Sequence, residues 1–274
     1  MQSELIISPG RVEKNYWGDL WRYRELFWFL AWRDILVRYK QAAIGVGWAL
    51  LRPLVTMLVL TAVFSRVAKL AAPGGVPYAL LVMAAMLPWQ FVATAVSESS
   101  QSLIGNGNLI SKIYFPRLII PTGAVLTNLV DLLISLGLMG ALMLWEGFSP
   151  DWRLCALPAF AVLGVACALG AGLWLSALNV QYRDFRYVVP FIVQCGLYVS
   201  PVGFSSGVIP PRWRLLYELN PMAGVIEGFR WCLLRGETAL DWTGVAMACG
   251  VTGALLGSGL WYFRRMERTF ADVI

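Results

Sequence analysis

Residues 154–178 read LCALPAFAVLGVACALGAGLWLSAL and contain no charged side chain. A helix needs about 20 apolar residues to cross the hydrocarbon core of a bilayer, so this stretch predicts a membrane-spanning helix. Similar apolar stretches occupy residues 48–67, 78–99, 118–145, 187–205 and 243–263. One soluble domain of 274 residues could not bury six such helices. The sequence therefore predicts an all-α membrane protein with six transmembrane helices.

The composition supports this class and argues against chemistry that depends on histidine or a metal. Hydrophobic residues make up 58% of the chain and charged residues 14%, against about 25% charged in an average soluble domain. The chain has no histidine, and its five cysteines lack the spacing of a metal site. We interpret the cysteines as small buried side chains and expect no metal site.

The distribution of Lys and Arg predicts the orientation, because the cytoplasmic loops of membrane proteins carry the excess of these residues. With the N-terminus in the cytoplasm, 15 of the 22 basic residues lie in cytoplasmic segments. We therefore expect a multi-pass protein of the cytoplasmic (inner) membrane with both termini in the cytoplasm. The net charge of +6 then requires no nucleic-acid partner.

The N-terminal segment differs from the rest of the chain. Residues 20–40, LWRYRELFWFLAWRDILVRYK, place charged residues between apolar ones at roughly helical spacing. This pattern predicts an amphipathic helix lying in the membrane interface, with Trp and Phe at the lipid boundary and Arg towards phosphate. The chain thus divides into a cytoplasmic N-terminus, 1–47, and a six-span domain, 48–274.

Residues 205–240 are too apolar for a solvated loop and too interrupted by Pro, Gly and charge for a simple span. Irregular backbone at membrane depth is tolerated only where protein buries it or where it lines a cavity. We expect two short re-entrant helices here, about 210–218 and 221–234, which form an outer gate between spans five and six.

Polar residues follow one face of two neighbouring spans. In the second span they are Gln90, Thr94, Ser97, Glu98 and Gln101, and in the third Asn128, Asp131 and Ser135. Helical spacing places each set on one side of its helix, and polar groups in a membrane face protein or water rather than lipid. The stripes predict either the wall of a polar conduit or hydrogen bonds that hold helices together.

The motifs of energy conversion and hydrolysis are missing. The chain contains no GxxxxGK[ST] sequence, which would cradle ATP phosphates, and no Ser/His/Asp set. If the protein performs work, its energy comes from a separate subunit.

Six segments in order resemble the membrane subunit, or permease, of ABC-2 type polysaccharide exporters, the group that moves O-antigen, capsule and teichoic-acid chains outward. The resemblance runs from about residue 25 to the C-terminus. Its segments are AWRDILVRYKQAAIGVGWALLRP at 31–53, Leu87-Pro88-Trp89, NLISKIYFPRLIIP at 108–121, NVQYRDFR at 179–186, Ser200-Pro201-Val202 and Leu219-Asn220-Pro221-Met222.

The resemblance implies a transporter subunit that is no enzyme itself. A second copy of the chain would complete the conduit, and two ABC ATPase subunits would bind below it. ATP and Mg would bind to those subunits, and this chain would bind no cofactor. The substrate would be a lipid-linked glycan, exported from a bilayer whose lipid surrounds the protein.

The resemblance and the side-chain chemistry together select candidate residues. Contacts with the ATPase would come from two cytoplasmic loops, through Asn108, Lys112, Tyr114, Arg117, Arg183 and Asp184. The anionic lipid diphosphate would meet basic residues near the inner entrance, namely Arg33, Arg38, Lys40 and Arg52. Aromatic rings that stack on sugars and polar groups that bind hydroxyls would line the conduit, namely Trp89, Gln90, Phe91, Thr94, Asp131, Trp174, Gln194, Tyr198 and Phe204.

Three alternatives remain open at this point. An ABC-2 exporter of a drug or small lipid would have the same fold and the same need for an ATPase. An intramembrane glycan-modifying enzyme would need clustered acid/base groups, for which Glu98 and Asp131 are the plausible residues. A small secondary transporter would usually show inverted repeats and paired broken helices, and the sequence has one interrupted segment.

Overall fold

The computed structural model describes residues 16–40, 45–69 and 72–270, which form helices and connecting loops with no strand among them. Five helical segments are long and apolar enough to cross a membrane, and they coincide with five of the six predicted spans. The principal helices are α1 (Tyr16–Arg22), α2 (Arg24–Lys40), α3 (Gly45–Thr61), α4 (Tyr78–Gly105), α5 (Gly107–Ile110), α6 (Ile119–Trp145), α7 (Leu157–Gln181), α8 (Phe185–Val199), α9 (Pro211–Glu218), α10 (Pro221–Leu233) and α11 (Trp242–Met266). A π-helical turn, Ala62–Val67, continues α3, and short 3-10 turns stand before α4, α7 and α9.

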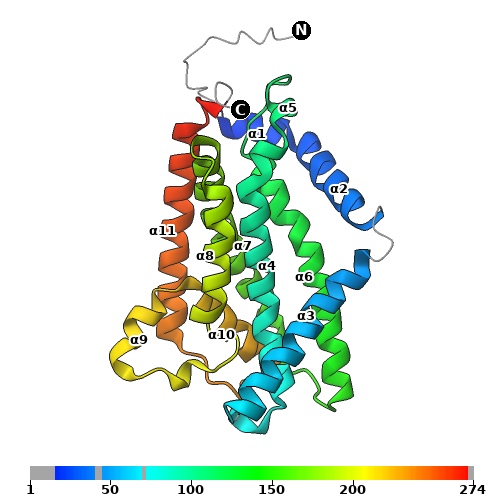
Figure 1. Ribbon diagram of the computed structural model, residues 1–274, viewed down its shortest axis with the longest axis vertical. Coiled ribbons are helices and arrows are strands. Elements are labelled where there is room, and N and C mark those ends of the chain that lie inside the picture. Colours follow the sequence, from blue (N-terminus) through cyan, green and yellow to red (C-terminus); the bar gives the residue numbers. More distant parts are fainter. Residues whose placement is uncertain (1–15, 41–44, 70–71, 271–274) are drawn as a thin grey trace.

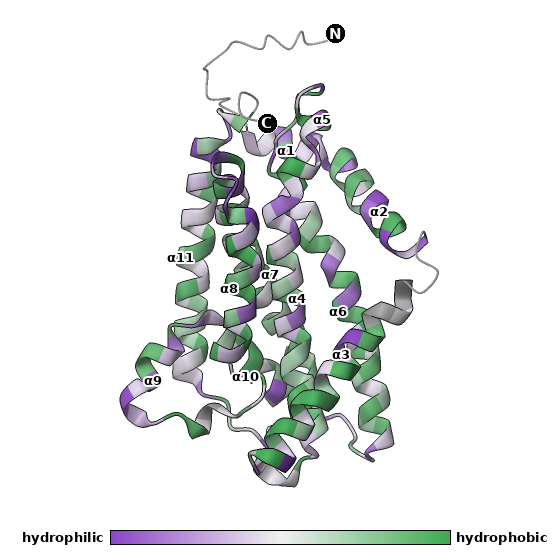
Figure 2. Cartoon of the chain, in the orientation of Figure 1, coloured by the Kyte–Doolittle hydropathy of each residue, from purple (hydrophilic) through white to green (hydrophobic). Residues whose placement is uncertain are grey.

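Helix α4 is the central element of the bundle. The most apolar part of α4 is 78% buried, against 11–28% in the other four long segments. It packs against α3, α6, α7, α8 and α10, and α7 packs in turn against α11 (Figure 1). Hydrophobic residues run along the lengths of these helices, as Figure 2 shows. The centre of the bundle is therefore filled by side chains.

Close backbone contact allows the packing around α7. A Cβ atom added to Gly170 would lie 2.8 Å from the backbone of Leu256 in α11, and one added to Gly172 would lie 2.6 Å from Ser99 Oγ in α4. Glycine is thus required at these two contacts, because any side chain would force the helices apart.

Only some of the five cysteines are buried. Cys167 and Cys232 are buried, whereas Cys155, Cys195 and Cys249 are exposed on the surface of the chain. The prediction of small buried side chains was wrong for these three residues, because apolar runs in a membrane protein also supply its lipid-facing surface.

The sequence prediction at 187–205 differs from the structure. Helix α8 ends at Val199 after 15 residues, and the chain then turns instead of continuing as a helix. A helix of 15 residues is shorter than the roughly 20 that the hydrocarbon core requires. The two short helices predicted after it are confirmed as α9 and α10, with bounds within one residue of those expected.

Arg230 of α10 fixes the backbone that follows α8. Its side chain is 2% exposed, and its guanidinium donates hydrogen bonds to the carbonyls of Leu81, Val202 and Phe204 at 2.9–3.2 Å. Tyr78 Oη donates to the carbonyl of Gly203 in the same segment. Non-helical carbonyls in an apolar bundle need such donors, since an unpaired one is costly. One arginine thereby joins α4, α10 and the turn after α8.

We predict that Arg230→Met lowers the thermal stability of the protein in detergent. Three carbonyls would lose a donor at about 1–3 kcal/mol each, which corresponds to a fall in Tm of at least about 5 °C. The matched control is Arg212→Met on the exposed surface of α9, which should leave Tm nearly unchanged. Equal Tm values for the two variants would contradict this role of Arg230.

Candidate functional site: a polar pocket among α2, α3, α4 and α6

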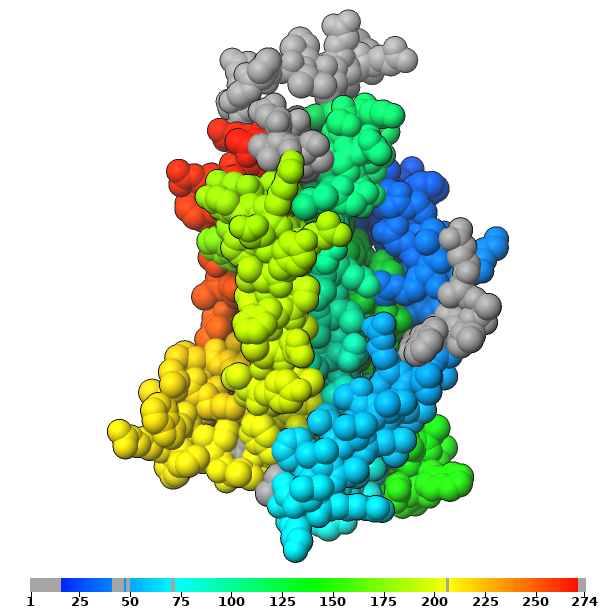
Figure 3. Space-filling view, in the orientation of Figure 1, coloured from blue at the N-terminus to red at the C-terminus, as the bar shows by residue number. Residues whose placement is uncertain are grey.

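A cavity of about 270 Å³ lies where α2, α3, α4 and α6 meet. Figure 3 shows a hollow at the surface between α2 and α4. Both predicted polar stripes contribute to the lining, together with the end of α2 and the middle of α3. The polar lining residues are Arg38, Tyr39, Arg52, Gln90, Thr94, Glu98, Asn128, Asp131 and Ser135.

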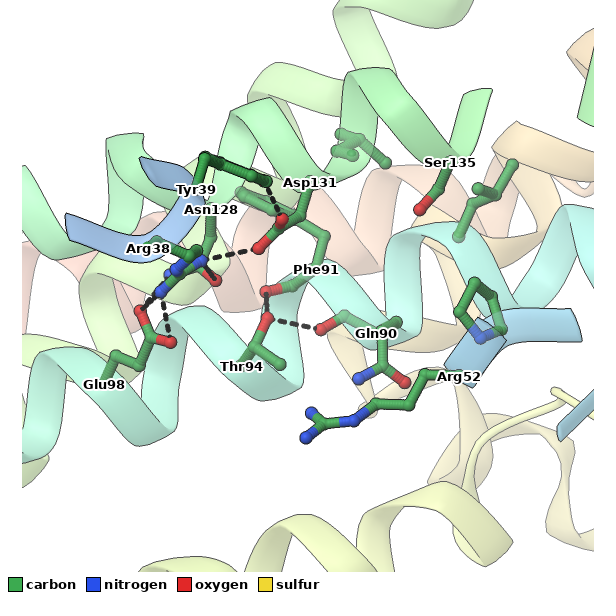
Figure 4. A pocket seen from close by; sticks show the side chains of 13 residues that line it. Arg38, Tyr39, Arg52, Gln90, Phe91, Thr94, Glu98, Asn128, Asp131 and Ser135 are labelled. Carbon is green, nitrogen blue, oxygen red and sulfur yellow. Dashed lines mark hydrogen bonds and ion pairs between the residues drawn. The ribbon is translucent and has the colours of Figure 1, made fainter. Parts of the chain in front are cut away.

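The centre of the pocket is an ion network around Arg38 (Figure 4). The guanidinium of Arg38 contacts Glu98 of α4 and donates to Asp131 Oδ2 of α6 at 2.5 Å. Asn128 Nδ2 donates to Glu98 Oε2 at 2.7 Å, and Tyr39 Oη donates to Asp131. A single residue of α2 therefore connects two helices of the bundle.

The network lies within the helices rather than at their ends. At 1.5 Å per residue, Glu98 stands roughly 10 Å and Gln90 roughly 22 Å before the last residue of α4. The charged side chains retain 27–41% of their exposure, because the cavity gives them access to solvent. The pocket is therefore a solvated polar space inside an apolar bundle.

Arg52 supplies the second positive charge of the pocket. It comes from α3 and lies beside Gln90, away from the Arg38 network (Figure 4). No hydrogen bond or ion pair of its guanidinium occurs within residues 16–40, 45–69 and 72–270. The two arginines balance the two carboxylates, so the pocket can receive neutral hydroxyl groups and offers one cation to an anionic group.

The structure brings together only part of the predicted conduit wall. Gln90, Phe91, Thr94 and Asp131 line the pocket. The other five lie elsewhere. The Trp89 ring is close to Gly196 of α8, and Gln194 and Tyr198 are exposed on α8. The Trp174 ring stacks on that of Tyr262 in α11 with 4.2 Å between ring centres, and the Phe204 ring centre lies 6.5 Å from that of Tyr217. A conduit role for all nine residues stays a prediction.

The four basic residues predicted at the entrance do not converge on one point. Arg38 and Arg52 share the pocket, whereas Arg33 contacts Asp34 and donates to Asn106 Oδ1 at 3.2 Å. Lys40 is exposed at the end of α2. Their role towards a lipid diphosphate also stays a prediction.

The six residues predicted to contact an ATPase lie at one end of the bundle. Asn108, Lys112 and Tyr114 are exposed in the α4–α6 loop, while Arg117 is half-buried against the segment after α11. Arg183 and Asp184 are exposed in the turn between α7 and α8. Tyr16 of α1 donates to Glu267 after α11, so both ends of the described chain also lie here.

The sequence of the chain matches the family described as ABC-2 type transporter over residues 25–234. The chain belongs to this family. The match covers α2 to α10 and so includes every element that lines the pocket.

Relatives of this ABC-2 family member are named as permeases and transport proteins. An O-antigen export system permease protein from Myxococcus xanthus is 27% identical over 258 residues, covering 93% of this chain and 98% of that protein. One from Klebsiella pneumoniae is 25% identical over 244 residues, covering 88% and 92%. A polysialic acid transport protein from Escherichia coli is 23% identical over 211 residues, covering 74% and 79%.

Sequence reasoning missed one member of the Arg38 network in this ABC-2 chain, Tyr39, and did not pair Arg38 with Glu98. Tyr39 stands beside Arg38 but carries no periodic signal of its own. Glu98 was recognised in the polar stripe, but the stripe could not indicate a partner in α2. The polar face of α4 and the arginine at the end of the preceding amphipathic segment were the signals that pointed to this pocket.

We predict that Arg38→Met destabilises the protein more than removal of the whole charge network. The single change leaves Glu98 and Asp131 without a cation and should cost about 1–3 kcal/mol, less than a fully buried pair because the groups are partly exposed. The triple variant Arg38→Met, Glu98→Gln, Asp131→Asn should recover part of this loss in thermal unfolding. A triple variant less stable than the single one would contradict the prediction.

The matched control is Arg24→Met on the same helix. Arg24 is exposed at the start of α2 and forms no ion pair within residues 16–40, 45–69 and 72–270; its guanidinium lies 5.4 Å from the centre of the Trp21 ring. An exposed cation–π contact contributes about 0.5–1 kcal/mol, so this variant should unfold close to the parent Tm.

Proposed function

We propose that this chain is the membrane subunit of an ATP-driven exporter that moves lipid-linked polysaccharide outward across the cytoplasmic membrane. The observation that carries the proposal is the solvated polar pocket inside a bundle of the ABC-2 family. The names of three relatives, all of glycan transport systems, favour this substrate over a drug or small lipid. Hydroxyl groups of sugars suit the amide, hydroxyl and carboxylate groups that line the pocket.

The filled centre of the bundle supports a conduit between two copies of the chain. Helix α4 leaves no passage through a single bundle, and 270 Å³ is too small for a polymer path. Figure 3 shows α3 and α8 on one face of the molecule. Both helices expose apolar side chains, among them Val55, Leu58, Phe191 and Ile192. We propose that the second copy faces this side and that the polar pocket opens towards the resulting conduit.

The proposed topology has six crossings with both termini in the cytoplasm. Five come from the long helical segments, and α8 with residues 200–205 makes the other. Helix α2 lies in the inner interface, because Trp28, Phe29 and Trp32 are exposed on one side while Arg38 turns inward. Segment 205–240 lies at the outer surface as a gate, with Arg230 anchoring it.

Energy would come from two ABC ATPase subunits, which carry the ATP and Mg. The exposed tip of the α4–α6 loop, with Lys112, Ile113 and Tyr114, is the surface that we assign to them, and the α7–α8 turn is a second contact. Aromatic residues such as Tyr114 are enriched in protein interfaces, whereas polar and charged residues such as Lys112 belong to the rim.

The first test is export itself in the native host. Deletion of the gene for this chain should abolish the surface polysaccharide and cause lipid-linked glycan to accumulate inside the cell. The chain, when purified, should bring an ABC ATPase with it. Unchanged surface glycan in the deletion strain would refute the proposed function.

The pocket gives a second prediction. Asp131→Ala should reduce the export rate about tenfold, which equals ~1.4 kcal/mol in the barrier, because Tyr39 and Arg38 lose a pocket partner.

Glu146→Ala is the control for the pocket variant, since Glu146 is exposed at the end of the same helix. Its export rate should match that of the parent chain. Normal export by Asp131→Ala at parental protein level would remove the pocket from the transport path.

The loop tip gives a separate prediction. Lys112→Glu or Tyr114→Ala should lower the amount of glycan exported per ATP hydrolysed, because the docking surface loses its charge or its ring. The ratio is measured with the purified complex in vesicles. Arg212→Glu, at the opposite end of the bundle, should leave the ratio unchanged, and a parental ratio in both loop variants would contradict the assignment.

A further inference from the structure

The loop between α4 and α6 is held at one end by hydrogen bonds and at the other by burial. At the first end Asn106 donates to the carbonyl of Ser102 at 2.9 Å and accepts from Arg33 of α2 at 3.2 Å. At the other end Phe115 and Pro116 are buried, and Phe115 is only 3% exposed. The tip between them remains exposed, so the position of the tip is set by these two anchors.

The second anchor includes an acidic residue from the far end of the chain. Glu267 follows α11 directly, and its Oε1 accepts from the backbone N–H of Arg117 at 2.8 Å. The guanidinium of Arg117 donates in return to the backbone carbonyl of Glu267. Tyr16 of α1 donates to the same Oε1 at 3.3 Å. One carboxylate thus joins the first helix, the last helix and the loop.

Packing around Glu267 makes this contact rigid. Phe263 and Phe270, on either side of it in the chain, are 0% exposed and meet edge to face at 5.3 Å. The Arg264 guanidinium lies 4.4 Å from the centre of the Tyr16 ring, within the range of a cation–π contact. Burial raises the pKa of the Tyr16 hydroxyl, so this group stays a hydrogen-bond donor at neutral pH.

We propose that Glu267 is a positioning residue, which fixes the loop 105–117 for contact with the ATPase subunit. The inference rests on the proposed function, because it assumes that the tip of this loop receives the ATPase. It adds a role for the segment after α11, which lies beyond the residues that match the family. It also assigns Arg117 to an internal contact rather than to the partner surface.

The geometry explains why a carboxylate stands at this position. The backbone N–H of Arg117 lies at the end of an irregular loop and has no partner in a regular helix there, so an acceptor from another segment must satisfy it. A charged acceptor binds two donors more strongly than a neutral one. Without it, the anchor at Arg117 would loosen, and the direction of the tip would vary.

The test uses the complete complex of chain and ATPase in vesicles and measures glycan exported per ATP hydrolysed. Glu267→Ala should lower this ratio about fivefold, the factor that one lost hydrogen bond typically represents. The concentration of ATPase subunit needed for half-maximal export should rise as well. Glu267→Gln keeps an oxygen acceptor for the Arg117 N–H and the Tyr16 hydroxyl, so it should retain most of the coupling.

Arg268→Ala is the matched control, because Arg268 is the exposed neighbour of Glu267. It should behave as the parent chain does. If Glu267→Ala is too unstable to assemble, amide hydrogen exchange of the Glu267→Gln and Tyr16→Phe variants replaces it. Exchange at residues 112–117 should then be faster in Tyr16→Phe than in the parent and close to parental in Glu267→Gln, and parental exchange in Tyr16→Phe would overturn the proposal.

Comparison with Lys112→Glu separates the two hypotheses. A lower coupling ratio in Lys112→Glu together with a parental ratio in Glu267→Ala would refute the positioning role and leave the docking loop intact. Parental ratios in both would refute the docking loop itself. A merely structural role would reduce the yield of Glu267→Ala without changing the ratio for each assembled complex, and this outcome would also overturn the proposal.

Discussion

Arg38 is shared by two carboxylates inside an otherwise apolar bundle, and the arrangement of the N-terminal half depends on this contact. Glu98 and Asp131 belong to neighbouring helices and would repel each other without a cation between them. The arginine comes from a helix that lies outside the bundle and exposes Trp and Phe on its other side. The network therefore links α2 to α4 and α6 at the polar pocket, in addition to the hydrogen bond between Arg33 and Asn106.

The same physical constraint acts at both ends of the molecule. Polar groups within an apolar bundle must find partners there, since lipid offers none. At one end Arg230 donates to two carbonyls of the turn after α8 and to the carbonyl of Leu81 in α4, and at the other end Glu267 accepts from the N–H of Arg117 and the hydroxyl of Tyr16. These centres fix the segments that close the bundle, while the tip of the α4–α6 loop stays exposed.

In the proposed exporter, the contacts of α2 would connect the loop that receives the ATPase with the polar pocket. Arg33 and Arg38 lie on one helix, and they contact Asn106 at the loop and the carboxylates of the pocket. A displacement of the loop would thus reach the pocket through α2, over contacts that the structure contains. Under the proposed function, the filled centre around α4 would place the polymer path outside the single bundle, so that a second copy of the chain would be needed.

The sequence by itself determined the class of the protein, because the length of each apolar stretch matches the thickness of the bilayer and the spacing of each polar stripe places it on one face of a helix. It indicated the five long apolar helices, the two short helices α9 and α10, and a shared polar surface for Gln90, Thr94 and Asp131. It missed the early end of α8, because the apolar run continues through a turn whose carbonyls Arg230 satisfies. It likewise could not pair Arg38 with Glu98 or Arg117 with Glu267. Periodicity reports only which face of a helix a residue occupies, whereas such pairs join residues 60 and 150 positions apart and exist only once the helices have packed.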